Sequence, residues 1–135
     1  KKVLGGIPMS LVEFFSLDLE QDSHTQVVYK ADELIDISSG AVSMRLVGKA
    51  HPSRAIAFLD ETYPPGSDTG EEMLNHEGEE AGVLVDGRLE LTVGSETYVL
   101  ERGDSYYFES NKPHRFRNPY DVPARLISAT TPANF

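Results

Sequence analysis

Two groups of polar side chains in the second half of the chain carry residue types that bind metal ions or transfer protons. They are His76, Glu79, Glu80, Asp104, His114 and Asn118. Strand residues of equal parity face the same side, so His76 and Glu80 can both point inward, and His114 shares its face with Phe116 and Asn118. Two imidazoles and one carboxylate suit Fe(II), Mn(II), Ni(II) or Zn(II). The sequence predicts a metal site of His76, Glu80 and His114, and the alternative is a set of hydrogen-bonded histidines.

The chain around these groups alternates between apolar and polar residues in short runs, which is typical of strands with one buried face. Such runs, or short apolar ones, cover residues 25–29, 41–47, 55–63, 83–93, 95–100 and 124–130. Residues 31–37 fit either a helical turn or a strand. Asp86-Gly87 is a strong hairpin signal because the turn needs a positive φ, and Gly94-Ser95 and Gly103-Asp104 mark further turns. The pattern predicts an all-β sandwich or small barrel.

The first residues have a helical sequence pattern, unlike the strand-like alternation of the rest of the chain. Ser10 followed by Glu13 makes a capping-box pattern, which predicts a short helix. The apolar side chains on one face of that helix are Leu11, Phe14 and Phe15. We expect residues 1–22 to form an N-terminal helical arm or linker and residues 23–135 to form the β domain. Because the chain starts at Lys1 and not at Met, we also expect it to be a piece of a longer protein.

Composition narrows the classes of function. The 135 residues suffice for one domain with a real core, and the absence of cysteine excludes disulfides, thiol nucleophiles and thiolate metal sites. No apolar run is long enough to span a membrane, and no signal peptide opens the chain, so we expect a cytoplasmic protein. The net charge is −10, from 22 acidic and 12 basic residues. Such a domain repels phosphate backbones and suits cationic or metal partners, although acidity also serves solubility.

The spacing of these residues resembles the two motifs of the cupins. The first cupin motif runs G-x5-H-x-H-x3,4-E-x6-G, and both His76-x3-Glu80 and Glu80-x6-Gly87 are similar to it. The second motif ends P-x-G-x2-H-x3-N, which His114-x3-Asn118 resembles. The resemblance implies a cupin double-stranded β-helix, a jelly-roll sandwich or barrel, with a divalent metal ion (Zn, Ni, Fe or Mn) as the expected cofactor.

The sequence departs from the cupin pattern at three positions. Leu74 stands where the motif has its first histidine, so one of the four usual metal ligands is missing. In the second motif, Glu109 replaces the proline and Asn111 replaces the glycine. The missing ligand weighs against an enzyme that depends on the metal.

A second resemblance covers nearly the whole chain. Four segments are similar to bacterial helix-turn-helix regulators of the Xre/Cro type, particularly the putrescine-utilisation repressors: LGGIPMSLVEFF, TGEEMLNHEGEEAGVLVDG, GDSYYFESNKPHRFRN and the terminal TTPANF. In that family the cupin binds an effector and helps to dimerise, while a separate N-terminal domain binds DNA. The resemblance implies an effector-sensing homodimer that contacts DNA only through a domain absent from this chain. The alternatives are a metal-dependent cupin enzyme, of isomerase or dioxygenase type, and a stand-alone binding module.

Acidic side chains around the motifs favour a cationic effector. They are Glu71, Glu72, Glu77, Glu79, Glu80, Asp104 and Glu109. A polyamine such as putrescine offers ammonium groups on an apolar stem, which matches acidic ends and aromatic walls. We therefore predict Glu72, Glu80, Tyr107 and Phe116 as effector-binding residues. The resemblance to putrescine-utilisation repressors implies the same ligand class.

Overall fold

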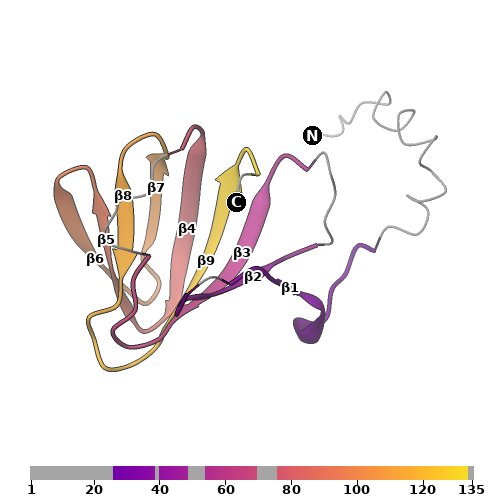
Figure 1. Cartoon of the computed structure of the whole chain (residues 1–135), viewed down its shortest axis with the longest axis horizontal. Coiled ribbons are helices and arrows are strands. Elements are labelled where there is room, and N and C mark those ends of the chain that lie inside the picture. The colour runs from indigo at the N-terminus through magenta and orange to yellow at the C-terminus, as the bar shows by residue number, and fades with distance from the viewer. Residues whose placement is uncertain (1–25, 39, 49–53, 70–75, 134–135) are drawn as a thin grey trace.

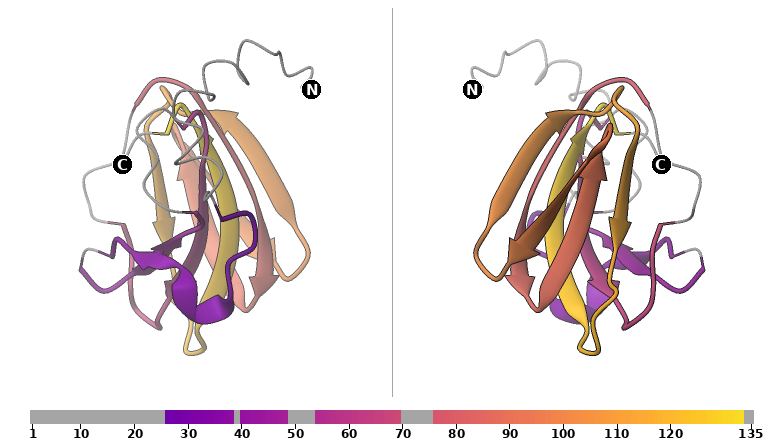
Figure 2. Two further views of the ribbon diagram at one scale, coloured as in Figure 1. Left: turned by 90° about the vertical axis from the view of Figure 1, so that its right-hand side faces the viewer. Right: turned by 90° about the vertical axis from the view of Figure 1, so that its left-hand side faces the viewer.

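A computed structural model describes residues 26–38, 40–48, 54–69 and 76–133, which fold into two antiparallel sheets facing one another (Figures 1 and 2). A 3-10 turn, η1 (Ala31–Glu33), precedes the strands. The strands are β1 (Ile35–Asp36), β2 (Ser43–Leu46), β3 (Ala57–Tyr63), β4 (Glu79–Asp86), β5 (Arg88–Val93), β6 (Glu96–Glu101), β7 (Ser105–Glu109), β8 (His114–Arg117) and β9 (Ala124–Thr131). The prediction of an all-β sandwich is confirmed.

The larger sheet has the strand order β1-β2-β3-β9-β4-β7, and the smaller has the order β6-β5-β8. Strand β9 lies between β3 and β4, so residues distant in sequence meet at its centre: Leu59 pairs with Ser128, and Glu80 pairs with Thr130. In the smaller sheet, Val93 of β5 pairs with His114 of β8. The polar residues of the two motifs are therefore carried by strands of different sheets.

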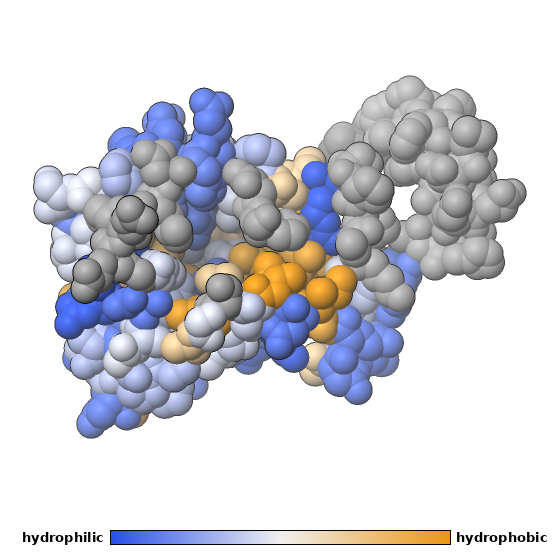
Figure 3. All heavy atoms as spheres, viewed as in Figure 1, coloured by the Kyte–Doolittle hydropathy of each residue, from blue (hydrophilic) through white to orange (hydrophobic). Residues whose placement is uncertain are grey.

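Alternating side chains from both sheets form the core. Tyr63, Leu84, Leu89 and Leu126 are fully buried in one cluster, and Met44 packs against it. Fully burying an aliphatic side chain contributes about 1.5–3 kcal/mol, so this cluster supplies much of the stability. A smaller cluster of Leu46, Ala57 and Leu59 lies beside it. Figure 3 shows apolar side chains in the middle of one face of a mostly hydrophilic surface.

The predicted hairpin at Asp86-Gly87 is wrong, although the turn itself is present. Gly87 has a φ of +81°, as the turn requires, but β4 and β5 belong to different sheets and do not pair. The chain passes from one sheet to the other here, and a Cβ atom at Gly87 would lie 2.3 Å from the Pro123 carbonyl oxygen. The true two-residue hairpin is at Gly94-Ser95, which joins the paired strands β5 and β6.

The N-terminal predictions have mixed outcomes. The helical arm at residues 1–22 lies outside the described residues. The strand predicted at 25–29 is wrong for its described part, because residues 26–30 have no regular structure. Segment 31–37 was predicted to be either a helical turn or a strand, and it contains both, the turn η1 and the short strand β1. Within the described ranges, no helix has the length and apolar character needed to cross a membrane.

Candidate functional site

A cavity of about 290 Å³ opens between the two sheets. Met44, Leu59 and Phe116 supply apolar walls. Four ionisable side chains also line it, and they are Glu61, His76, Glu80 and His114. The volume is at the lower end of the range for small-molecule sites, so the cavity fits a ligand of few atoms.

His76, Glu80 and His114 converge in this cavity. Each offers a ligand atom, and these atoms all lie within 4.8 Å of one another. Glu80 is on β4 of the larger sheet, whereas His114 is on β8 of the smaller one, and its Nε2 lies 3.9 Å from Glu80 Oε1. His76 precedes β4 and is half-buried, with its ring edge-on to that of His114 at 5.5 Å between centroids.

The orientation of His114 is fixed by its backbone neighbour. Its Nδ1 lies 2.9 Å from the Lys112 carbonyl oxygen, to which an Nδ1–H donates. Burial lowers the pKa of His114, so the ring is neutral and Nε2 carries a lone pair. This Nε2 is buried and has no hydrogen-bond partner among the described residues. Because buried polar atoms are rarely left unpaired, this Nε2 is a candidate ligand atom for a group bound in the cavity.

Glu80 is held by a tyrosine that reaches across β4. The Tyr106 hydroxyl donates a hydrogen bond of 2.8 Å to Glu80 Oε2, which leaves Oε1 facing His114. Gly82 makes room for this contact, since a Cβ atom there would lie 2.6 Å from the Tyr106 oxygen. Burial raises the pKa of Glu80 to about 7, although the hydrogen bond from Tyr106 opposes the shift.

Glu61 is a site residue that sequence reasoning missed. Its side chain is 4% exposed and accepts hydrogen bonds from the Tyr63 hydroxyl (2.9 Å) and from the Ser128 hydroxyl (2.5 Å). Burial raises its pKa to about 7, and the nearby Glu80 carboxylate adds to the shift. A signal was present, because Glu61 has the inward parity of Leu59 and Tyr63 in β3.

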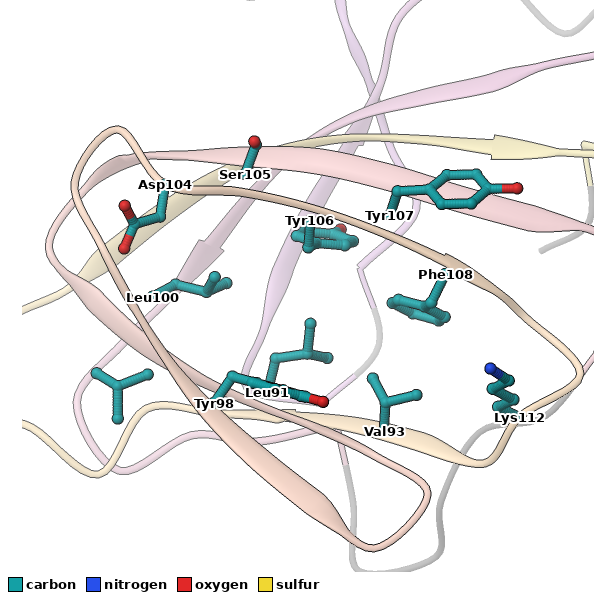
Figure 4. A pocket seen from close by; sticks show the side chains of 11 residues that line it. Leu91, Val93, Tyr98, Leu100, Asp104, Ser105, Tyr106, Tyr107, Phe108 and Lys112 are labelled. Carbon is teal, nitrogen blue, oxygen red and sulfur yellow. The ribbon is translucent and has the colours of Figure 1, made fainter.

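The other predicted effector residues lie in different places. Phe116 lines the cavity, and Glu72 lies outside the described residues. Tyr107 is 62% exposed and does not reach the cavity; Figure 4 shows it pointing away from Tyr106 and Phe108 on the neighbouring positions of β7. It borders a separate groove of about 500 Å³ that is lined mainly by residues of β5, β6 and β7.

That larger groove is a poorer place for a cation. Among the described residues its only acidic side chain is Asp104, which is exposed and accepts a hydrogen bond from the Glu101 backbone N–H. Lys112 adds a positive charge to the same lining. Of the acidic residues predicted to surround the effector, Glu77, Glu79 and Glu109 are also exposed. Glu80 is therefore the one acidic residue of that set, within the described ranges, that lines the cavity.

The residues of the His76–Glu80–His114 cluster fit a divalent metal ion. Two imidazoles and one carboxylate are the donor set of many Zn²⁺ and Fe²⁺ sites. The Nε2 lone pair of His114 faces the cavity, and the Nδ1 contact to the Lys112 carbonyl is the outer hydrogen bond that metal-bound histidines usually make. A metal ion here would be held by His76, Glu80 and His114, and it would act as a Lewis acid.

The two-sheet sandwich and the His/Glu/His cluster in its cavity define the class of protein. Residues 59–130 match the cupin domain family, and the chain belongs to that family. It also belongs with the helix-turn-helix regulators that carry a cupin. All 135 residues are 42% identical to the HTH-type transcriptional regulator PuuR of Escherichia coli K12 and cover 72% of that protein. This relative is a transcriptional regulator, which agrees with the prediction that the chain is not an enzyme.

Solved structures support the fold. The cupin domain of an XRE-family transcriptional regulator from Enterobacter cloacae is 22% identical, with a TM-score of 0.60 over 67% of this chain and 96% of that one. An RmlC-like cupin from Shewanella frigidimarina is 17% identical, with a TM-score of 0.68 over 82% and 94% of the two chains. At these identities the likeness establishes the double-stranded β-helix and nothing about the ligand.

Proposed function

We propose that this chain is the effector-sensing domain of a transcriptional regulator and that it binds a small cationic metabolite, of the polyamine class, in the cavity between its sheets. The relation to a helix-turn-helix regulator supports the regulatory role. DNA would be contacted only through a helix-turn-helix domain outside residues 1–135. Residues 1–22 would link that domain to the cupin at 23–135, and the regulator would work in the cytoplasm.

One observation carries the choice of ligand. Glu61 and Glu80 are both buried in an apolar-walled cavity, and no Lys or Arg of the described residues forms an ion pair with either. Opposite charges about 4 Å apart gain about 4 kcal/mol at an effective dielectric near 20, before desolvation is subtracted. A ligand with ammonium groups on an alkyl chain would satisfy both the carboxylates and the apolar walls.

Calorimetric titration tests the ligand class. Putrescine and spermidine are expected to bind the chain below millimolar concentration, whereas an uncharged diol of the same length as putrescine is expected not to bind. The diol presents the same alkyl stem without the charge, so it isolates the electrostatic contribution. If the diol binds as well as the diamine, or if neither polyamine binds below millimolar concentration, the polyamine proposal is wrong.

We further propose that His76, Glu80 and His114 bind a divalent metal ion. The carboxylate must be deprotonated to act as a ligand, and burial raises the pKa of Glu80 to about 7. Affinity for Zn²⁺ is therefore expected to fall as the pH is lowered from 7.5 to 5.5, by about 25-fold from Glu80 alone. Competition titration with a metal-sensitive dye measures this change.

Two variants accompany the metal titration. His114→Ala is expected to abolish stoichiometric binding, whereas Glu79→Gln, which changes an exposed neighbour of Glu80, should leave it intact. Metal analysis of protein purified without chelator or nickel resin would identify the ion that binds in the cell. Affinity that does not change with pH, or binding that survives in His114→Ala, would contradict the assignment.

A homodimer is the assembly that we propose, because regulators of this type read two-fold operators. A row of outward-facing side chains crosses four strands of the larger sheet and offers a surface for a second copy. The registers align Phe58, Ala129, Ala81 and Tyr107 in this row. Phe58 and Tyr107 are 41% and 62% exposed, which is costly for large side chains unless a partner covers them.

Sedimentation tests the dimer. Phe58→Asp places a charge in the row and is expected to weaken dimerisation by about tenfold or more. The matched control is Val122→Asp, which changes an exposed apolar residue (49%) in a loop outside the row. A wild-type chain that sediments as a monomer at micromolar concentration would refute the proposal.

A further inference from the structure

The cavity presents hydrogen-bond acceptors from two carboxylates, Glu61 and Glu80, and from one imidazole, that of His114. Three nearby hydroxyls already donate to these carboxylates: those of Tyr63 and Ser128 to Glu61, and that of Tyr106 to Glu80. His114 contributes a lone pair at Nε2, which is buried and lacks a partner in the described part of the chain. A ligand that complements this cavity must bring donors and positive charge, and an ammonium group has three donors and no acceptor.

Glu61 lies at a different place in the cavity from the histidine cluster. It is on β3, where it contacts Tyr63 of the same strand and Ser128 of β9, whereas the group of His76, Glu80 and His114 does not include it. A carboxylate has about four acceptor positions and receives two hydrogen bonds here, so it has capacity left for a ligand. Glu61 and the histidine cluster are thus two groups of acceptors in one cavity, which Met44, Leu59 and Phe116 also line.

The burial of Glu61 is difficult to explain by stability. A buried carboxylate without a cation is costly, and an apolar side chain of similar volume is often more stable in such a place. Within the described residues no cation pairs with Glu61, and its side chain is 4% exposed. Buried ionisable groups of this kind, when they face a cavity, are typical of ligand sites.

We propose that Glu61 forms a second ammonium-binding subsite, so that a short diammonium ligand places one end at Glu61 and the other between Glu80 and His114. The alkyl stem of the ligand lies along Met44 and Phe116. This assignment rests on the proposed polyamine function and adds the residue that distinguishes a diamine from a monoamine. A divalent metal ion at the histidine cluster competes with the second ammonium group for Glu80.

Calorimetry on chelator-treated protein tests the subsite with 1,4-diaminobutane and 1-aminobutane. The wild-type chain is expected to bind the diamine at least about tenfold more tightly than the monoamine, because only the diamine reaches both carboxylates. In Glu61→Gln the diamine should bind no better than the monoamine binds the wild type. Glu79→Gln removes an exposed carboxylate of the same sheet and is expected to change neither affinity.

A second variant keeps the charge and changes the distance. Glu61→Asp withdraws the carboxylate by one methylene, so 1,5-diaminopentane should gain affinity relative to 1,4-diaminobutane. Thermal melting confirms that each variant folds. If the diamine binds Glu61→Gln as tightly as the wild type, or the aspartate variant shows no change in preferred length, the subsite is wrong while polyamine sensing stands. If the wild type binds no amine, both proposals are wrong.

Discussion

Replacing Glu61 by glutamine is expected to stabilise the domain at pH 8 by about 3 kcal/mol and to leave its stability unchanged at pH 4. Burial raises the pKa of Glu61 from 4.5 to about 7 in the folded chain. Glutamine has nearly the same shape and carries no charge. The Tyr63 and Ser128 hydroxyls can rotate to donate to its oxygen or accept from its amide group.

The pH window follows from the two pKa values. Below pH 4.5 the Glu61 carboxyl is protonated in both the folded and the unfolded chain, so it contributes no pH dependence. Between pH 4.5 and about 7 the unfolded chain releases the proton and the folded chain retains it. The free energy of unfolding therefore falls as the pH rises through this window, and it becomes constant above the folded-state pKa.

Urea unfolding of the wild type, Glu61→Gln and Glu79→Gln at pH 4, 6 and 8 measures the effect. The Glu79 variant controls for the loss of an exposed acidic side chain and should follow the wild type. A Glu61→Gln variant that is no more stable than the wild type at pH 8 would mean that the hydroxyl hydrogen bonds outweigh the cost of burying the charge.

The cost of burying the Glu61 carboxylate also changes how the domain responds to a ligand. A cation that enters the cavity stabilises the ionised form of Glu61, so it offsets the cost that the empty domain carries. The ligand then stabilises the folded chain by mass action, and more strongly at high pH than at low pH. The carboxylate that weakens the empty domain is thus the feature that makes it responsive to a cationic ligand.

The strands were predictable because each has a local pattern. In the alternating segment 41–47, Val42 and Leu46 have the same parity, and both are buried. The partner of each strand was not predictable in the same way, since pairing joins residues far apart in sequence. The turn at Asp86-Gly87 shows the limit: glycine signals a positive φ, but it cannot signal whether the next strand pairs or changes sheets.

The site was partly predictable for the same reason. Parity and motif spacing placed His114 and Glu80 on inward faces, and the structure brings them together with His76. Glu61 was missed because it lies in an apolar run that reads as core, although its parity is inward. Tyr107 was chosen for its aromatic ring, yet it lies on the opposite face of β7 from the residues that point between the sheets.

Asn118 ends the second motif, and the structure explains it by hydrogen bonding and not by ligand contact. Its side chain is fully buried at the start of the connection between β8 and β9. Nδ2 donates to the Tyr63 and Val122 carbonyl oxygens at 2.8 and 2.9 Å, and Oδ1 accepts from the Tyr120 N–H at 2.9 Å. The side chain thereby ties this connection to the end of β3.

Replacing Asn118 by alanine is expected to destabilise the domain by about 3 kcal/mol or more. The three hydrogen bonds contribute about 1 kcal/mol each, and their loss leaves buried backbone groups without partners. Alanine also leaves a small void at a fully buried position. Because Tyr63 also donates to Glu61, looser packing at the end of β3 should weaken binding in the cavity as well.

Thermal and urea unfolding of Asn118→Ala measure the loss, and Asn111→Ala is the matched control. Asn111 is exposed, so its replacement should change the free energy of unfolding by less than about 0.5 kcal/mol. Asn118→Asp separates hydrogen bonding from volume, because a carboxylate keeps the acceptor for the Tyr120 N–H but cannot donate to the two carbonyl groups. If the aspartate variant is as stable as the wild type, the two donated hydrogen bonds do not hold the connection, and packing together with the bond accepted from the Tyr120 N–H accounts for this residue.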